Sequence, residues 1–326
     1  MLVRLLKANY IYNFILFPLV GILLLAYSFL YGENSFMGIS NESSLQLFLF
    51  SEFTIQYKWA VALNIIPLVI ICLQLLNLNS KFAFANERTF LPVYLFLFLV
   101  YTISELHTFQ PIFISTIFII WSIQNIFSAY EKRCALTNAF NAGLMIGIAG
   151  IFCFYLNFLV LIIPFALIII RGKIEWREMV LPFIGMILPW IFAVSGYYLT
   201  DNFDVFISAF NSNFVIHHLH FFTQIPIVIY LIYLSLLIFL ASIHIIGRYS
   251  IMNIVTRRYF KVLVLLFSSL TLLIVLPFTQ YHLLVIMAIP VSFLLTNFFL
   301  YLRKRFWAEL FLAILIVFAF TLQFFR

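Results

Sequence analysis

Long apolar stretches alternate with short polar gaps along almost the whole chain of 326 residues. An apolar stretch of about twenty residues is long enough to cross the hydrocarbon core of a bilayer as a helix. With boundaries placed at charged residues, Pro, Gly and Asn, the pattern predicts an all-α, polytopic transmembrane helical bundle. About eleven spans are expected, at 12–31, 58–78, 90–104, 112–129, 138–155, 157–170, 179–199, 225–246, 262–278, 283–301 and 308–325.

Lys and Arg fall at every second gap between these stretches and are almost absent from the gaps in between. Because cytoplasmic loops are enriched in Lys and Arg, this alternation predicts a cytoplasmic N-terminus and an outside C-terminus. The outside gaps hold only Lys58 and Arg326. The inside gaps hold Arg4, Lys7, Lys81, Arg88, Lys132, Arg133, Arg171, Lys173, Arg177, Arg248, Arg257, Arg258, Lys261, Arg303, Lys304 and Arg305.

The stretch 138–170 carries no charged residue and is too long for one helix to match the bilayer. Asn157 favours a tight turn between two short helices, and the pattern leaves open two spans or a re-entrant pair. Gly143, Gly147 and Gly150 have the small-residue spacing that lets neighbouring helices approach closely. We therefore expect these glycines to act in helix packing.

The composition is 65% hydrophobic and only 9% charged, which excludes a water-soluble fold of this length. One integral membrane domain over 1–326 is expected, as a multi-pass protein of the bacterial inner (cytoplasmic) membrane. The first apolar stretch lacks a clear cleavage site, so it is interpreted as a retained helix. The net charge of +7 resides in short inner loops, which favours contact with membrane lipids and argues against binding to nucleic acid.

Histidines and acidic residues gather on the predicted outer side, where few cations accompany them. Acidic residues contribute little to topology, so this second asymmetry suggests that the outer face is the working face. The first of two long outer loops, 32–57, holds Glu33, Glu42 and Glu52. Its second half, 44–56, is apolar enough for a helix lying along the membrane surface.

The second long outer loop, 200–224, combines carboxylates with imidazoles. Asp201, Asp204, His218 and His220, with His217 beside them, have the chemistry to ligate a divalent metal ion. In the alternative interpretation, the aspartates cap a short helix and the histidines are amphipathic residues of an interfacial loop.

Three further ionisable residues, Glu105, His107 and His282, lie close to predicted outer helix ends. An ionisable group near the membrane is costly unless it faces a cavity or a partner, which makes each a candidate for contact with substrate or phosphate. The alternative is that these side chains simply reach interfacial water.

The order of these parts resembles that of the multispanning GT-C glycosyltransferases. A first helix leads through Tyr31 to Asn34 into an acidic outer loop with the apolar segment 44–56. A glycine-rich stretch, 139–150, is followed by Pro164, a basic segment and Leu188-Pro189. The resemblance is architectural and covers about the first 200 residues of the chain.

The GT-C resemblance implies transfer of a sugar from a polyprenyl-phosphate carrier at the outer face of the membrane. It implies Glu33 as the general base, with Glu42 or Glu52 second, and a divalent metal ion in the site. The usual paired acidic motif is absent, and the outer face has almost no Lys or Arg. Contacts to the lipid phosphate would therefore fall to metal and to the outer histidines, namely His107, His217, His218, His220 and His282.

Two other functions remain open from the sequence. The shortage of ionisable residues within the spans and the many aromatics fit a non-catalytic membrane subunit of an envelope or secretion complex. A transporter or lipid flippase would normally bury ionisable residues at mid-membrane, whereas these spans hold mainly Asn64, Gln74 and Gln124 as polar groups. The composition also resembles an uncharacterised inner-membrane family of Bacteroidota, from which no activity can be carried over.

Overall fold

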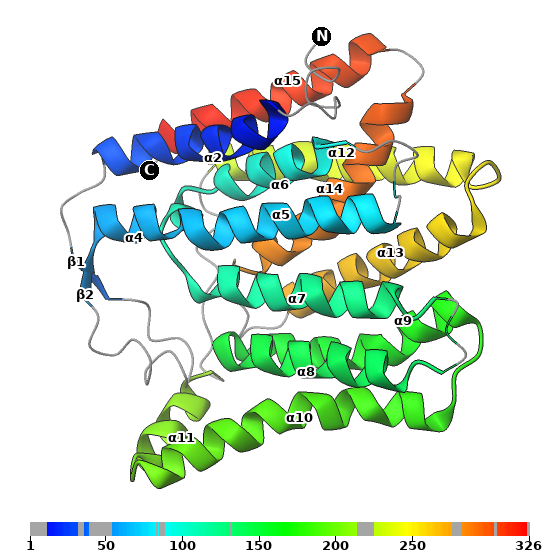
Figure 1. Ribbon diagram of the computed structural model, residues 1–326. Helices are drawn as coiled ribbons and strands as arrows, with labels where there is room; N and C mark the ends of the chain where they lie inside the picture. Colours follow the sequence, from blue (N-terminus) through cyan, green and yellow to red (C-terminus); the bar gives the residue numbers. More distant parts are fainter. Residues whose placement is uncertain are drawn as a thin grey trace.

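A computed structural model describes residues 12–31, 36–38, 54–82, 84, 89–130, 132, 134–213, 225–275, 282–302 and 305–324. The structure is helical apart from one short antiparallel ribbon, which confirms the expected helical fold class (Figure 1). The ribbon pairs β1 (Phe36–Gly38) with β2 (Thr54–Gln56). The helices are α2 (Tyr12–Tyr31), α4 (Tyr57–Leu63), α5 (Ile65–Phe82), α6 (Leu91–Tyr101), η1 (Ser104–His107), α7 (Pro111–Phe127), α8 (Leu136–Phe152), η2 (Phe154–Leu161), α9 (Ile162–Arg171), α10 (Trp176–Leu199), α11 (Phe203–Ser212), α12 (Ile225–Arg248), α13 (Ile254–Ile274), α14 (Leu283–Tyr301), α15 (Arg305–Thr321) and η4 (Leu322–Phe324).

Each expected span coincides with a helix or with two consecutive helical segments. Within the described residues, six segments are long and apolar enough to cross a membrane, and four apolar helices are shorter. The architecture therefore indicates a multi-helix membrane protein. The six segments are Tyr12–Leu30, Lys58–Phe82, Phe154–Arg171, Trp176–Leu199, Ile225–Arg248 and Leu283–Tyr301.

Three helices begin at least three residues earlier than the hydrophobic pattern predicts. The expected spans began at 179, 262 and 308, whereas α10 begins at Trp176, α13 at Ile254 and α15 at Arg305. In each case the helix includes charged residues that had been taken as its boundary. A helix can extend past the apolar layer into the polar surface, because its backbone hydrogen bonds form equally well there.

The centre of the bundle is formed by α6 and α14. All eleven residues of α6 are buried, and α14 is buried along most of its length. Such helices are apolar on every side because they face protein in all directions. By contrast, α10 and α12 expose much of their apolar surface, as expected for helices that face lipid.

The α8–α10 pair confirms the expected packing role of the glycines. A Cβ atom at Gly143 would lie 2.0 Å from the Pro182 carbonyl oxygen, and one at Gly147 would lie 2.4 Å from that of Met186. These distances leave no space for a side chain, so only glycine allows the two backbones to approach this closely.

The turn expected at Asn157 lies at Cys153 instead, where the backbone is extended between α8 and η2. Asn157 lies inside η2, where its side chain faces Gly150 and accepts a 3.1 Å hydrogen bond from the Trp190 indole. Its amide thus serves the packing of η2 against α10, and 138–170 forms two helical segments.

The connections between the helices gather at two ends of the bundle (Figure 1). One end, here called the cation end, carries the α7–α8, α9–α10 and α12–α13 connections. Lys132 and Lys173 lie in the first two of these connections, and Arg248 ends the helix before the third. The opposite end, here called the α11 end, carries α11 and the β1–β2 ribbon. The expected interfacial helix over 44–56 is contradicted at 54–56, which pair with β1 as a strand, and 44–53 lie outside the described residues.

Candidate functional site

Several of the predicted site residues fall outside the part of the chain that the structure describes. For Glu105 only the backbone, in η1, is described. The structure therefore places His107, Asp201, Asp204 and His282. The residues outside its scope are Glu33, Glu42, Glu52, His217, His218 and His220.

His107 is fully buried and lies in a network at the α11 end. Its Nδ1 atom shares a hydrogen bond with the Ser28 hydroxyl, and its Nε2 atom lies 2.9 Å from the Tyr101 carbonyl oxygen. The Asn64 side-chain amide donates 3.1 Å hydrogen bonds to the carbonyl oxygens of both Leu106 and His107. Because these contacts tie α2, α6 and η1 together, they favour a structural role for His107 over the predicted phosphate contact.

His282 precedes α14 and is also buried, with 6% of its surface exposed. Burial disfavours the charged imidazolium and lowers its pKa from 6.5 to about 4. The ring is therefore neutral at physiological pH. As a phosphate ligand, His282 would act only through a neutral hydrogen bond and not through charge.

Asp201 and Asp204 lie at the junction of α10 and α11, and both are exposed. Asp201 adopts a left-handed backbone conformation with φ of 54°, which reverses the chain between the two helices. Asp204 lies in the first turn of α11, where a carboxylate is favoured by the helix dipole. The short helix expected as an alternative is present, although no side chain caps its first residue.

Helix α11 rests on aromatic side chains. The centre of the Phe206 ring lies 5.3 Å from the centre of the Tyr197 ring, and the centre of the Phe210 ring lies 5.2 Å from the centre of the Phe154 ring. On its other side, α11 exposes Val205 and other apolar residues. A helix that packs one face on the protein and exposes another, apolar face has the arrangement expected for a helix lying along a membrane surface.

An open apolar groove of about 450 Å³ runs between α8 and α10. It lies in the halves of these helices that are nearer to α11, because α8 ends at Phe152 and α10 at Leu199. At 1.5 Å per residue, its last lining residue, Ala193, is about 9 Å along the helix from Leu199. The lining residues are Leu144, Ile148, Ile151, Leu188, Pro189, Phe192 and Ala193.

Residues 43–326 match the sequence profile of a family of unknown function, DUF6427. The chain belongs to this family. No curated protein and no solved structure matches it. The DUF6427 match includes α8, α10, α11 and the loop 200–224, whereas Glu33 and Glu42 precede it.

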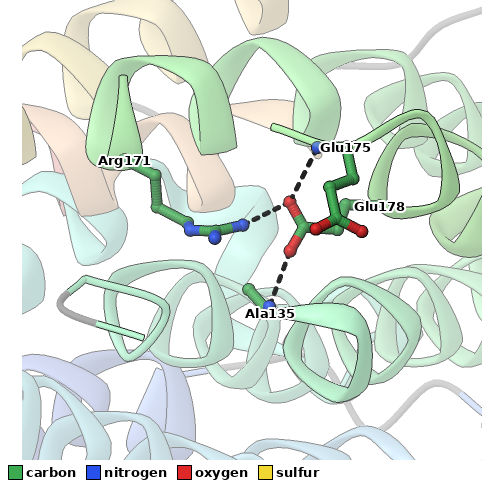
Figure 2. Close-up of polar contacts among 4 residues, drawn as sticks. All are labelled: Ala135, Arg171, Glu175 and Glu178. Carbon is green, nitrogen blue, oxygen red and sulfur yellow. Dashed lines mark hydrogen bonds and ion pairs between the residues drawn. The ribbon is translucent and has the colours of Figure 1, made fainter. Parts of the chain in front are cut away.

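A buried clasp at the cation end of this DUF6427 chain was not anticipated from the sequence (Figure 2). The Glu178 carboxylate, fully buried, forms an ion pair with Arg171 and accepts hydrogen bonds from the backbone N–H groups of Ala135 (2.6 Å) and Glu175 (3.2 Å). It therefore joins the beginnings of α8 and α10 to the end of α9, which Gly172 terminates with φ of 82°. The sequence feature that could have revealed the clasp is Glu178 itself, a carboxylate among the predicted inner cations, seven residues after Arg171.

The predicted metal ligands remain a hypothesis. Within the described ranges, no group of three or more His, Cys, Asp and Glu side chains is close enough together to hold a metal ion. Asp201 and Asp204 can supply carboxylate oxygens, which divalent cations prefer. The histidines expected to join them lie in the segment 214–224, which is outside the described residues.

Proposed function

We propose that this protein is a multi-pass protein of the bacterial inner membrane that binds a polyprenyl-phosphate-linked sugar and transfers the sugar at the outer face. In this proposal about eleven helices cross the bilayer, the cation end faces the cytoplasm and the α11 end faces outward. The observation that carries the proposal is the apolar groove between α8 and α10, which leads toward the α10–α11 junction.

The groove suits an isoprenoid chain because its lining is apolar and one of its two walls is α10, a helix with much exposed apolar surface. A lipid-linked substrate can enter such a groove sideways from the bilayer, without leaving the apolar phase. An extended chain in the groove would bring its phosphate toward Asp201 and Asp204.

The head group would then meet the α10–α11 junction. A divalent metal ion held by Asp201 and Asp204, with His218 and His220 as further proposed ligands, would neutralise the departing phosphate. Glu33 remains the proposed base that removes the proton from the acceptor hydroxyl, with Glu42 and Glu52 as alternatives. The metal is needed because the outer loops offer almost no Lys or Arg to balance the phosphate charge.

Photo-crosslinking with a diazirine-bearing polyprenyl phosphate tests this proposal on the full chain in membranes. We expect labelling of the peptides that contain 144–151 and 188–193. Ala193→Trp fills the groove and should reduce the labelling about tenfold, a loss of roughly 1.4 kcal/mol. Leu236→Trp, on the exposed face of α12, is the matched control and should leave labelling unchanged. Equal labelling of both variants would exclude the groove as the lipid site.

A second candidate function is a subunit of a larger membrane complex. Helix α12 exposes seven apolar side chains at alternating spacings of four and three residues, a pattern typical of helix–helix seams. If the purified chain binds the lipid but transfers no sugar until other membrane proteins copurify with it, this second function holds instead. The seven residues are Ile225, Ile229, Ile232, Leu236, Phe239, Ile243 and Ile246.

A further inference from the structure

Three cations gather around two tyrosine rings where α12 leads into α13. The Arg248 guanidinium lies 3.6 Å from the centre of the Tyr301 ring. Arg257 and Lys261 lie 5.0 Å and 5.8 Å from the centre of the Tyr249 ring. Arg248, Arg257 and Lys261 are here called the α12–α13 cation cluster.

Among the described residues, no carboxylate pairs with this cluster. The sequence from 225 to 275 contains no Asp or Glu, and none of the three cations forms an ion pair with another described residue. Tyrosine rings offset part of the charge, since a ring face attracts a cation. At the same end of the bundle Arg171 is neutralised by Glu178, whereas the structure shows no such ion pair for the cluster within the described ranges.

The protein holds the Arg257 side chain in place. Arg257 donates hydrogen bonds of 2.9 Å and 2.8 Å to the carbonyl oxygens of Ser250 and Met252. The Nη1 atom of Arg248 is buried and has no hydrogen-bond partner among the described residues. Lys261 is exposed beside them. Arg248 and Arg257 are partly exposed, so together with Lys261 they can meet an anion with several oxygen atoms, such as a phosphate group.

The surroundings of the cluster favour the phosphate of a lipid over a soluble anion. Ile246, Ile251 and Ile254 flank the cluster with 73%, 74% and 64% of their surfaces exposed. Exposed isoleucines beside a charged cluster suit the boundary between acyl chains and head groups better than open water. Tyrosine rings are also enriched at that level, and basic pockets at the cytoplasmic ends of membrane helices bind anionic head groups.

We infer that the α12–α13 cation cluster binds the head group of an anionic phospholipid at the cytoplasmic surface of the membrane. Three cations without a carboxylate favour a head group with two phosphates, such as that of cardiolipin, over one with a single phosphate. The site lies at the opposite end of the bundle from the proposed sugar-transfer site and does not depend on that activity.

Native mass spectrometry of the full chain in mild detergent, titrated with cardiolipin or phosphatidylcholine, tests this inference. We expect cardiolipin to bind the wild type more tightly than phosphatidylcholine. Lys261→Gln should weaken cardiolipin binding about fivefold and Arg257→Gln/Lys261→Gln about thirtyfold, which corresponds to roughly 1 kcal/mol for each cation. Lys173→Gln removes an exposed cation of the same end outside the cluster and should have little effect.

Two results would overturn the inference. If Lys173→Gln weakens cardiolipin binding as much as Lys261→Gln, the attraction is a general property of the cation end and not of this cluster. If inorganic phosphate displaces the lipid at equal concentration, the site serves a soluble anion. Because Arg257 also holds the backbone of the connection, Lys261→Glu provides a second test that leaves those hydrogen bonds intact and should weaken binding more than Lys261→Gln.

Discussion

Replacing Glu178 by alanine is expected to destabilise the folded protein by about 3–5 kcal/mol. The change removes the carboxylate from a buried Arg171 guanidinium, whose side chain is only 10% exposed, and from the backbone N–H of Ala135. A charge left in a buried position without its counter-ion costs far more than the original pair contributed. Thermal unfolding in detergent, followed by circular dichroism, measures the effect as a lower unfolding midpoint.

Two controls separate the ion pair from a general loss of helix capping. Glu175→Ala removes an exposed residue of the same capping box and should cost only about 1 kcal/mol. Arg171→Met/Glu178→Leu replaces both charges by apolar side chains and should recover much of the stability that Glu178→Ala loses. If Glu178→Ala unfolds at the same temperature as Glu175→Ala, the clasp does not contribute to stability.

A single methyl group at Gly143 is expected to have an effect of comparable size. The Cβ atom of Gly143→Ala would lie 2.0 Å from the Pro182 carbonyl oxygen, so α8 and α10 must separate along their shared surface. Backbone atoms cannot move aside as a flexible side chain does, so we expect a loss of about 3 kcal/mol or more. Yield of folded protein and the thermal unfolding midpoint both report this change.

Gly196→Ala is the matched control for the glycine contact. Gly196 lies on α10, and a Cβ atom there would meet nothing within 4 Å. Alanine has the higher helix propensity, so this variant should be unchanged or more stable by up to about 1 kcal/mol. Equal unfolding midpoints for the two variants would show that α8 and α10 do not approach as closely as described. In Gly143→Ala, the separation of α8 from α10 would also distort the groove that these two helices line.

The sequence predicted the helices well because each contains a long apolar stretch. It misplaced the start of α13 because Arg257, Arg258 and Lys261 were taken as the end of the apolar layer, although a helix can carry such residues beyond it. It did not anticipate the Glu178 clasp, since the sequence does not show that the Glu178 side chain turns back to Arg171 and also reaches the distant Ala135. Cation counts along a chain give no information on which charges meet in space.

The candidate site was less predictable than the fold. Position near a helix end made His107 a functional candidate, yet the sequence does not show which way a helix turns its side chains, and His107 faces inward to Ser28. The α8–α10 groove was not predicted, because it depends on the shapes of two surfaces in contact. For Asp201 and Asp204 the expected position in the connection after the seventh span agrees with the α10–α11 junction.

The central claim is that the cation end and the α11 end lie on opposite sides of the membrane, with the α11 end outside. Cysteine labelling with a membrane-impermeant maleimide in intact cells tests it directly, because the exposed native Cys134 marks the cation end. In an Asp204→Cys variant, we predict that the cysteine at 204 reacts in intact cells, whereas Cys134 reacts only after the membrane is permeabilised. Labelling of Cys134 in intact cells, with position 204 protected until permeabilisation, would contradict the proposed orientation.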